Sequence, residues 1–254
     1  MKILVTNDDG IFANGIKEIS IKLSEIAEVI VVAPDRERSA IGHAITIHTP
    51  LRVEKTENII PNIEAWAING TPSDCVKIAV ESIMKKKPDL IVSGINNGPN
   101  LGTDVIYSGT VSAAIEGAMH SIPSVAISAC FFNGKINYES VAKISCKIIK
   151  NLIKKDLPKN IILNINVPSL PLEQIKGIKI TELGIRKYNN NYVKRTDPKG
   201  KNYYWLSGEL IEIENKDTSD IVAIEEGFIS ITPLHFDLTA YNYLDELKNW
   251  KLKM

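Results

Sequence analysis

Short apolar runs alternate with amphipathic stretches through the first two-thirds of the chain. The runs are rich in β-branched residues and apolar on both faces, which is typical of strands covered by helices on both sides. We expect strands at Lys2–Thr6, Val29–Ala33, Leu90–Ser93, Ser124–Ala129 and Asn160–Ile165. The stretches between them predict helices at Gly15–Ala27, Ser73–Lys86, Thr110–His120 and Tyr138–Lys154. This alternation predicts an α/β fold with a Rossmann-like, mostly parallel sheet and flanking helices.

Two stretches inside this region depart from the rhythm. Ala44–Lys55 and Glu64–Ile68 have the pattern of extra strands, inserted after the second core strand. The helix expected next has a clear start, because Thr71 can cap it and Asp74 can complete a capping box. The extra strands would therefore widen the sheet without changing its class.

The pattern changes again from Lys179 onward. Strand-like pieces rich in Tyr and Trp are punctuated by expected turns at Asn189–Asn191 and Asp197–Gly200. We divide the chain into a Rossmann-like core, residues 1–178, and a C-terminal arm, residues 179–254, with a strand and a helix that return to the core. A thin hairpin is marginal alone, so we expect the arm to pack on a partner subunit. Folding back on its own core is the alternative that the pattern leaves open.

Composition narrows the function classes. The chain has 254 residues, 44% of them hydrophobic, with 30 basic and 30 acidic residues, so its formal net charge is zero. This balance gives no general reason to bind nucleic acid or a membrane, and any anion site must be local. We expect no signal peptide, since Met1-Lys2 leads straight into a strand, and no apolar run approaches the ~18 residues of a membrane span.

Cysteine and histidine usage argues against a soft-metal site. The three cysteines, Cys75, Cys130 and Cys146, are far apart in apolar surroundings, which is typical of free thiols in a reducing cytosol. We therefore expect a cytoplasmic protein. The histidines show no metal-ligand spacing and are interpreted as ordinary surface or loop residues; they are His43, His48, His120 and His235.

Polar residues follow the expected core strands, where ligands bind in open α/β sheets. The first strand ends in Asn7-Asp8-Asp9-Gly10, and adjacent carboxylates there would repel each other unless a cation lies between them. A hard divalent ion prefers such oxygen ligands. The alternative is that one Asp caps a turn and the other faces solvent. The loop Ser93–Gly102 holds three asparagines and three glycines; it could add a neutral oxygen ligand or be a plain connection.

A second set of residues could hold an anion. Ser108-Gly109-Thr110 opens a helix of small residues, and a helix N-terminus is a ready phosphate site, although a simple Ser cap explains this segment equally well. Arg36 and Arg38 could steady a phosphate or form surface ion pairs. Ser39 has no histidine partner fixed by the sequence, so a hydrolase triad is unsupported and its hydroxyl fits better as a weak cation ligand.

These motifs together resemble the SurE (survival protein E) family of nucleotidases. The resemblance spans almost the whole chain. Its fragments are ILVTNDDGI at 3–11, NGI at 14–16, VVAPDRERSAIGHAIT at 31–46, NGTPSDCV at 69–76, PDLIVSGINNGPNLGTDVIYSGTVSAAIEGA at 88–118, TDPKGKNYYWL at 196–206 and EGFISITPLHFDLTAY at 226–241. Each fragment is weak alone, but the ordered set is specific. The departure from the commoner APGI form to FANGI places Asn14 near the site.

The resemblance implies a 5′-nucleotidase, a metal-dependent phosphoric monoester hydrolase. Its implied substrates are nucleoside 5′- and 3′-monophosphates, with short polyphosphate as a further candidate, and it implies no nucleic-acid or membrane partner. It implies one divalent ion, Mg²⁺, Mn²⁺ or Ca²⁺, per subunit, and an arm exchanged within a homodimer or homotetramer. Carried over by position, the implied metal ligands are Asp8, Asp9, Ser39 and Asn96. The implied phosphate and substrate contacts are Asn14, Gly42, Ser108, Gly109 and Thr110.

The mechanism that follows is metal-assisted hydrolysis, with Asp8 and Asp9 as the catalytic pair and Asp9 favoured as the proton acceptor. A dehalogenase-like phosphatase is the enzyme alternative, but it usually shows Asp-x-Asp after the first strand, and Asn7 stands where the first Asp should be. A receiver-like signalling module would need a phospho-acceptor Asp at a later strand end, and none is found there. A plain nucleotide-binding module stays open, although the two acids would repel a phosphate without a metal. A role for His43 is left undecided.

Overall fold

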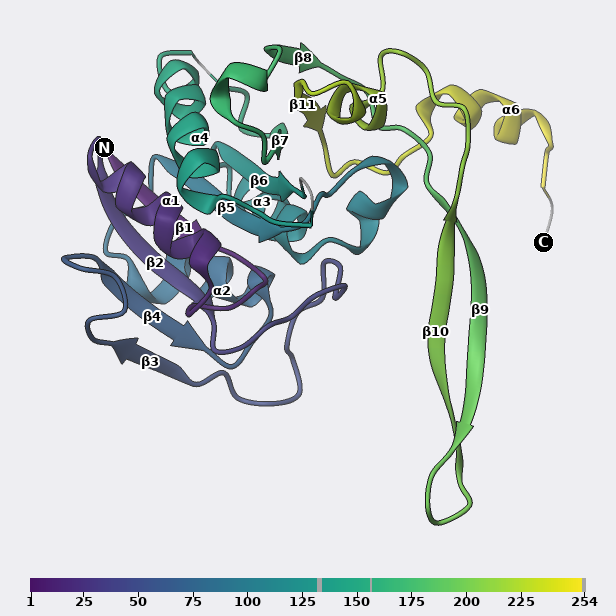
Figure 1. Cartoon of the computed structure of the whole chain (residues 1–254), viewed down its shortest axis with the longest axis horizontal. Coiled ribbons are helices and arrows are strands. Elements are labelled where there is room, and N and C mark those ends of the chain that lie inside the picture. The colour runs from purple at the N-terminus through teal and green to yellow at the C-terminus, as the bar shows by residue number, and fades with distance from the viewer. Residues whose placement is uncertain (132–133, 156, 253–254) are drawn as a thin grey trace.

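A computed structural model describes residues 1–131, 134–155 and 157–252 (Figure 1). These described residues form eleven strands, with helices between many of them. The strands are β1 (Lys2–Thr6), β2 (Glu28–Pro34), β3 (Val53–Thr56), β4 (Glu64–Ile68), β5 (Leu90–Asn97), β6 (Ser124–Cys130), β7 (Ile162–Pro168), β8 (Ile178–Ile180), β9 (Lys187–Thr196), β10 (Asn202–Ile211) and β11 (Ile229–Leu234). The α-helices are α1 (Asn14–Ser24), α2 (Pro72–Ile78), α3 (Gly109–Met119), α4 (Tyr138–Leu152), α5 (Asp220–Glu225) and α6 (Leu244–Asn249). Shorter helical turns are η1 (Ala79–Ile83), η2 (Gly102–Tyr107), η3 (Leu172–Gln174) and η4 (Tyr241–Tyr243).

Nine strands form one sheet in the order β3-β4-β2-β1-β5-β6-β7-β11-β8. The six strands from β4 to β7 in this order run parallel. β3 pairs antiparallel with β4 at one edge, and β11 pairs antiparallel with β7 near the other. Helices lie on both faces of the sheet (Figure 1). The predicted Rossmann-like α/β fold is therefore confirmed.

The alternation of side chains along β1 explains how both faces are filled. Ile3 and Val5 pack with α1 and α4 in one apolar cluster, whereas Leu4 packs with α2 and α3 in another. All three side chains are fully buried. Since neighbouring residues of a strand point to opposite faces, an apolar run without alternation requires helices on both sides.

The strand order places three strand ends next to each other. β1 lies between β2 and β5, and all three run in the same direction, so their carboxyl ends share one edge of the sheet. Thr6 pairs with Ser93 in the last register position, so the residues that follow each strand start from the same level. The loops after β1, β2 and β5 consequently meet above this edge.

The structure corrects three boundaries. The helix expected at Ser73–Lys86 is α2 followed by the single π-helical turn η1; Thr71 and Asp74 do form the expected capping box. The strand expected at 90–93 continues to Asn97, so half of the predicted loop belongs to β5. The extra strand expected at Ala44–Lys55 is shorter, and only the end of this stretch lies in β3. Backbone groups of Ala44 and Thr46 form hydrogen bonds with side chains at the start of α2 instead of with a strand.

The strands β9 and β10 form a separate two-stranded ribbon that extends away from the sheet (Figure 1). The Asp197–Gly200 turn is confirmed, with Gly200 N donating to Asp197 O at 2.9 Å. The turn expected at Asn189–Asn191 is wrong, because these residues lie inside β9 and pair with Ser207–Glu209. Asn is a poor strand former where a face must pack. Within the described residues, β9 pairs only with β10, and this continuous pairing from the turn decides its conformation.

The last part of the chain returns to the core and then leaves it. β11 pairs with β7 and β8, and α5 packs beside them. Beyond β11, the segment with η4 and α6 is exposed along its length. Across the described residues, no helix combines the length and the apolar character that crossing a membrane requires. The cysteines Cys75, Cys130 and Cys146 are free and buried, as the sequence indicates.

Candidate active site

The loop after β2 closes over the end of β1. Arg38 N donates to Asp8 O at 2.7 Å, and Ile11 N donates to Pro34 O at 2.9 Å. Gly10 has a φ of +95°, and a side chain there would meet the Arg36 backbone at 3.0 Å. The Asp8-Asp9 turn is thus held against the next strand end by main-chain contacts that need glycine.

Asp8 faces the start of α3. Its side chain is 5% exposed, and the Thr110 hydroxyl donates to Asp8 Oδ1. A Cβ atom at Gly109 would lie 2.8 Å from Asp8 Cβ and 2.9 Å from Asp8 Oδ2. The carboxylate can approach the helix N-terminus this closely because position 109 has no side chain. The structure therefore brings together the predicted acid at the end of β1 and the predicted phosphate-binding segment.

Asp9 faces the carboxyl end of β5. Its Oδ2 accepts a hydrogen bond from Asn97 N at 2.9 Å. Burial raises the pKa of Asp9 to about 6, and the negative charges of Asp8 and Glu37 add to this. Burial also raises the pKa of Asp8 against the opposing hydrogen bond from Thr110. A buried and a partly buried carboxylate thus stand side by side at the strand end.

The two arginines of the loop after β2 do not neutralise this pair. Arg36 and Arg38 lie 3.8 Å from Asp35 Oδ1, and Arg38 also donates to Asn69 O at 2.8 Å. In the described part of the chain, no ion pair reaches Asp8 or Asp9. The arrangement favours the surface-pair interpretation of both arginines and leaves the acidic pair in need of a cation.

The donor set fits a hard divalent ion better than a soft one. Among the described residues, no group of three or more His, Cys, Asp or Glu side chains is placed to hold a metal. Oxygen donors of other kinds flank the pair. Asn96 is part-buried and its amide nitrogen donates to Gly98 O at 2.8 Å, which leaves the amide oxygen for a ligand. Two carboxylates, an amide oxygen and a hydroxyl are the chemistry that Mg²⁺, Mn²⁺ or Ca²⁺ accepts.

Ser39 is the predicted ligand that the structure does not turn toward the pair. It is exposed, and its hydroxyl donates to Glu37 Oε1 at 2.7 Å. Glu37 itself acts electrostatically on both Asp8 and Asp9. From the sequence, Glu37 is assigned no role, although it lies two residues before Ser39 in the stretch PDRERS. The feature that could have identified it is a third acidic residue in the loop that follows the neighbouring strand.

The phosphate segment begins α3 with a side-chain cap. Ser108 is 6% exposed and its hydroxyl accepts from Val111 N at 3.1 Å. Thr110 is fully buried against Asp8. The hydroxyls of both residues are thus engaged within the protein, and the backbone N–H groups of the first turn are what α3 offers to an anion.

Asn14 and Gly42 border the site from two further elements. Asn14 is the exposed first residue of α1, and the next residue, Gly15, presses against Ile95 O, one residue before Asn96. Gly42 has a φ of +59° and its N–H donates to Tyr107 O at 3.0 Å, just before Ser108. Both positions therefore lie within a residue or two of a predicted ligand.

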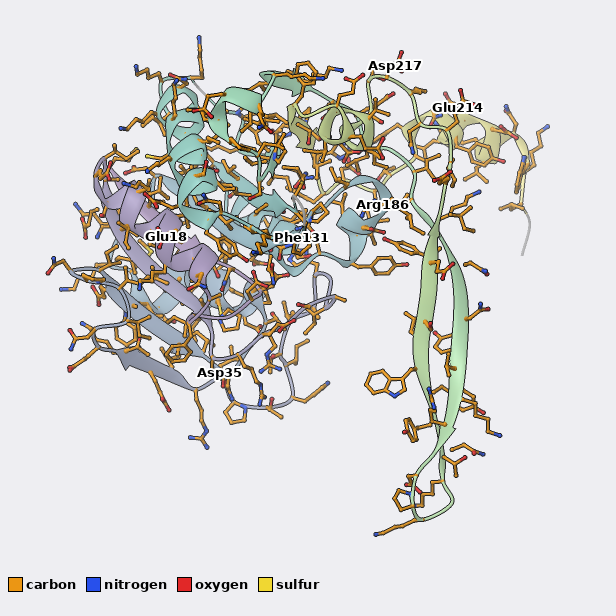
Figure 2. The ribbon with its side chains drawn as sticks, in the orientation of Figure 1. Glu18, Asp35, Phe131, Arg186, Glu214 and Asp217 are labelled. Carbon is orange, nitrogen blue, oxygen red and sulfur yellow. The ribbon has the colours of Figure 1, made fainter. Side chains whose placement is uncertain are left out.

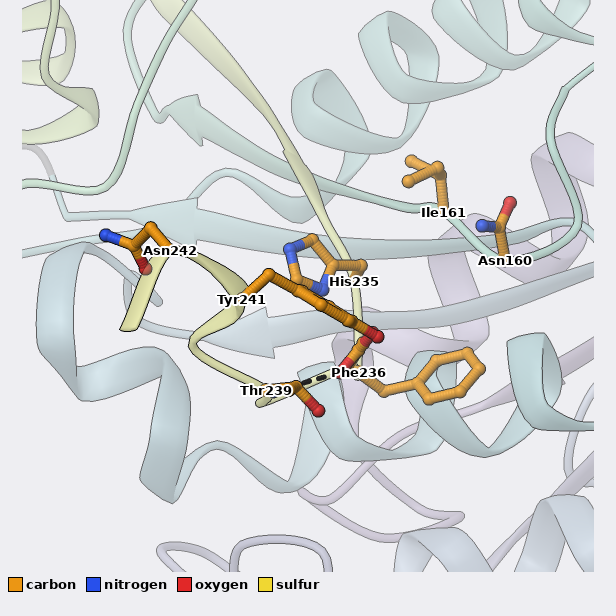
Figure 3. A pocket seen from close by; sticks show the side chains of 8 residues that line it. Asn160, Ile161, His235, Phe236, Thr239, Tyr241 and Asn242 are labelled. Atoms are coloured by element: carbon orange, nitrogen blue, oxygen red, sulfur yellow. Dashed lines mark hydrogen bonds between the residues drawn. The ribbon is translucent and has the colours of Figure 1, made fainter. Parts of the chain in front are cut away.

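A separate hollow lies away from the site and contains none of these residues. Its volume is about 720 Å³, and it opens between the start of β7 and the segment that follows β11 (Figure 3). Asn160, His235 and Tyr241 are among the residues that line it, and the Tyr241 hydroxyl donates to Asp237 Oδ2 at 2.5 Å. These lining side chains are exposed, so the hollow is an open surface and not a built site.

Comparisons with known proteins agree with this geometry. Residues 3–190 match the family model described as Survival protein SurE. A protein named 5′-nucleotidase SurE from Alkaliphilus metalliredigens is 51% identical over 255 residues, which cover 100% of both chains. Its namesake from Carboxydothermus hydrogenoformans is 51% identical over 253 residues, covering 98% of this chain and 96% of the relative. A crystal structure of a SurE protein from Aquifex aeolicus superposes with a TM-score of 0.85 at 41% identity, covering 99% and 100% of the two chains.

Proposed function

The chain belongs to the SurE family, and we propose that it is a metal-dependent 5′-nucleotidase that hydrolyses nucleoside 5′-monophosphates to nucleoside and phosphate. The observation that carries the proposal is the contact of the Asp8-Asp9 turn with the N-terminus of α3. This contact brings two carboxylates, which favour a bound cation, next to a helix N-terminus, which favours a bound anion. Nucleoside 3′-monophosphates and short polyphosphate are finer proposals for the same site, because they present the same terminal phosphoryl group.

In this mechanism, Asp8, Asp9, Ser39 and Asn96 supply the oxygens of a single divalent-ion site. When bound, the ion, Mg²⁺, Mn²⁺ or Ca²⁺, offsets the phosphoryl charge and lowers the pKa of a coordinated water. To hold the ion, Ser39 would have to turn away from Glu37 Oε1, to which its hydroxyl donates at 2.7 Å.

The other residues orient the substrate and move the proton. The first backbone N–H groups of α3, at Gly109 and Thr110, hold the phosphoryl oxygens, with Ser108 fixing the turn as its cap. Asn14 and Gly42 border the bound substrate. Asp9 Oδ1, the oxygen not bonded to Asn97, accepts the proton of the attacking water.

Two exposed aromatic rings support a nucleoside substrate. Tyr107, which is 65% exposed, immediately precedes Ser108. Phe131, labelled in Figure 2, is 54% exposed, and its ring lies against Gly98, the residue directly after β5. Flat apolar surfaces on either side of a phosphate site can stack a base without selecting one base over another.

We further propose that the protein is a cytoplasmic homodimer or homotetramer whose arm is exchanged between subunits. The ribbon offers apolar side chains to a partner, with Tyr204, Trp205 and Leu206 exposed at 58%, 66% and 63%. Free buried thiols suit a reducing compartment.

The test is phosphate release from nucleoside 5′- and 3′-monophosphates and short polyphosphate, before chelation, after chelation and after Mg²⁺ or Mn²⁺ is added back. We expect activity on 5′-monophosphates to vanish with the chelator and return with the metal. Activity that persists in the chelator would reject the metal-dependent mechanism. An acid-stable phospho-enzyme trapped during turnover would favour the dehalogenase-like alternative instead.

A further inference from the structure

A buried carboxylate in the C-terminal half of α3 takes no part in the mechanism above. Glu116 is 4% exposed and lies about two turns after the phosphate segment. Its Oε2 is 2.9 Å from His43 Nε2, and its Oε1 is 3.2 Å from His120 Nε2 and 3.7 Å from Lys77 Nζ. Burial favours a raised pKa, but the His43 hydrogen bond and the charges of Lys77, His43 and His120 bring the pKa of Glu116 below its usual value. An ionised carboxylate therefore gathers groups from three parts of the chain.

The two histidines contact Glu116 in different ways. His43 comes from the loop that follows Ser39, and its contact has hydrogen-bond geometry. His120 ends α3 itself, and its Nε2 finds no hydrogen-bond partner among the described residues in spite of its closeness to Glu116. Only the first contact joins Glu116 to another segment of the site.

Apart from the His43 contact, this loop is held at its two ends and at Gly42, whose N–H donates to Tyr107 O at 3.0 Å. Arg38 N bonds to Asp8 O at 2.7 Å before it, and Thr71 Oγ1 donates to Ala44 O at 2.7 Å after it. Between these anchors, Ala40 and Gly42 have φ of 54° and 59°, a backbone region that costs free energy for Ala. The segment also lacks buried apolar side chains, and such segments open at low cost unless specific contacts hold them.

We propose that His43 and Glu116 are positioning residues: their hydrogen bond fixes the segment Ser39–Gly42 against α3 and thereby sets Ser39 relative to the helix start at Ser108–Thr110. The inference rests on the proposed function, because it takes Ser39 and Gly42 as part of the site. The fold supports it directly, since α3 carries the phosphate segment at one end and the acceptor for His43 further along. The helix α3 thus positions both the segment Ser108–Thr110 and the segment Ser39–Gly42.

The experiment compares three variants of the full chain, His43→Ala, His43→Gln and His120→Ala. His43→Ala removes the hydrogen bond at a side chain that is 29% exposed, so the fold should survive. His43→Gln restores a donor, and His120→Ala removes a neighbour of the same carboxylate that does not touch the loop. Mn²⁺ affinity is measured by calorimetry on the metal-free protein, and KM and kcat are measured with a nucleoside 5′-monophosphate.

We expect His43→Ala to weaken Mn²⁺ binding and raise KM about tenfold each, in line with the loss of an outer-shell partner, with kcat changed less. His43→Gln should recover most of both losses, and His120→Ala should leave both within about twofold of the wild type. Unchanged Mn²⁺ affinity and KM in His43→Ala would overturn the inference, and so would equal effects in His120→Ala. An inactive wild-type enzyme would reject the proposed function, while the Mn²⁺ titration would still decide the role of His43.

Discussion

At the carboxyl edge of the sheet, Asp8 is 5% exposed, whereas Trp205 in the ribbon is 66% exposed. The edge is packed so closely that position 109 tolerates no side chain beside Asp8. The ribbon is held by the pairing of β9 with β10, and its side chains project into solvent away from the root at Arg186 (Figure 2). The sheet edge is thus a closely packed region that carries two like charges. The ribbon is a paired region whose apolar side chains remain exposed.

The comparison shows what each region lacks. Like charges in a packed frame are relieved by an ion, because the frame cannot move them apart. Exposed aromatic side chains on a two-stranded ribbon are relieved by another polypeptide, since such a ribbon is marginal alone. The proposal therefore assigns a cation to the sheet edge and a second copy of the chain to the ribbon.

The largest expected effect comes from removing one charge at the edge. Asp8→Asn and Asp9→Asn should each lower kcat/KM for a nucleoside 5′-monophosphate at least about a hundredfold, since direct ligands matter more than outer-shell partners. Each should also stabilise the metal-free protein, because the repulsion between the two acids is gone. Steady-state kinetics and thermal unfolding in a chelator measure the two results.

Asp89→Asn is the matched control for these variants. Asp89 Oδ2 accepts from Lys2 N at 2.7 Å, so it touches the opposite end of β1. It should leave kcat/KM within about twofold. Full activity in either Asp8→Asn or Asp9→Asn would contradict the assignment.

The next effect concerns the ribbon. Trp205→Ser with Tyr204→Ser should weaken subunit association by about 2 kcal/mol or more, as aromatic anchors do in interfaces. Sedimentation velocity over a concentration series measures it. Lys194→Ser, at the position paired with Tyr204, is the control and should leave association unchanged. A wild-type chain that sediments as a monomer at all concentrations would sink the exchanged-arm proposal.

A substitution at Gly109 tests the packed frame itself. Gly109→Ala should destabilise the protein by about 1–3 kcal/mol, because the new Cβ would lie 2.8 Å from Asp8 Cβ. It should also reduce activity by displacing Asp8 from the helix start. Chemical denaturation and phosphate release are measured on the same preparation. Wild-type values for both would contradict a role for the close contact between Gly109 and Asp8 in stability and activity.

The smallest expected effect is the pH dependence of the metal-free protein. The folded pKa of Asp9 is raised from 3.8 to about 6, so the native state binds more protons than the unfolded state between these values. Stability should therefore increase as pH falls from about 7 toward 4, by on the order of 1–2 kcal/mol for a half-exposed group. The difference between the wild type and Asp9→Asn in chelator isolates this contribution. A difference that does not vary with pH would contradict the raised pKa.

Much of the fold could be predicted from the sequence, because the residue types of the core strands indicate that both of their faces are buried. The run Ile3-Leu4-Val5 has no polar face, and only a sheet covered on both sides buries it. The Thr71–Asp74 capping box likewise identified the start of α2. The turn predicted at Asn189–Asn191 is wrong, because the prediction used only the preference of Asn for turns. In the structure, pairing with Ser207–Glu209 keeps these residues in the strand β9.

The site could be predicted in part for the same reason. Asp8 and the start of α3 lie 100 residues apart in sequence, and the parallel strand order brings them together at one edge. The role of Glu37 and the His43–Glu116 contact could not be predicted, because they depend on how one loop folds over its neighbours. His43 and His120 looked alike as scattered loop histidines, but only the structure shows that both approach one buried carboxylate.

The central claim is that Asp8 and Asp9 hold a divalent cation at the start of α3. Anomalous diffraction from crystals soaked in Mn²⁺ tests it most directly. The account predicts a peak in contact with both carboxylates, at about 2.0–2.6 Å from their oxygens, with the Asn96 amide oxygen beside it. A strong Mn²⁺ peak elsewhere on the chain, with none between Asp8 and Asp9, would contradict it.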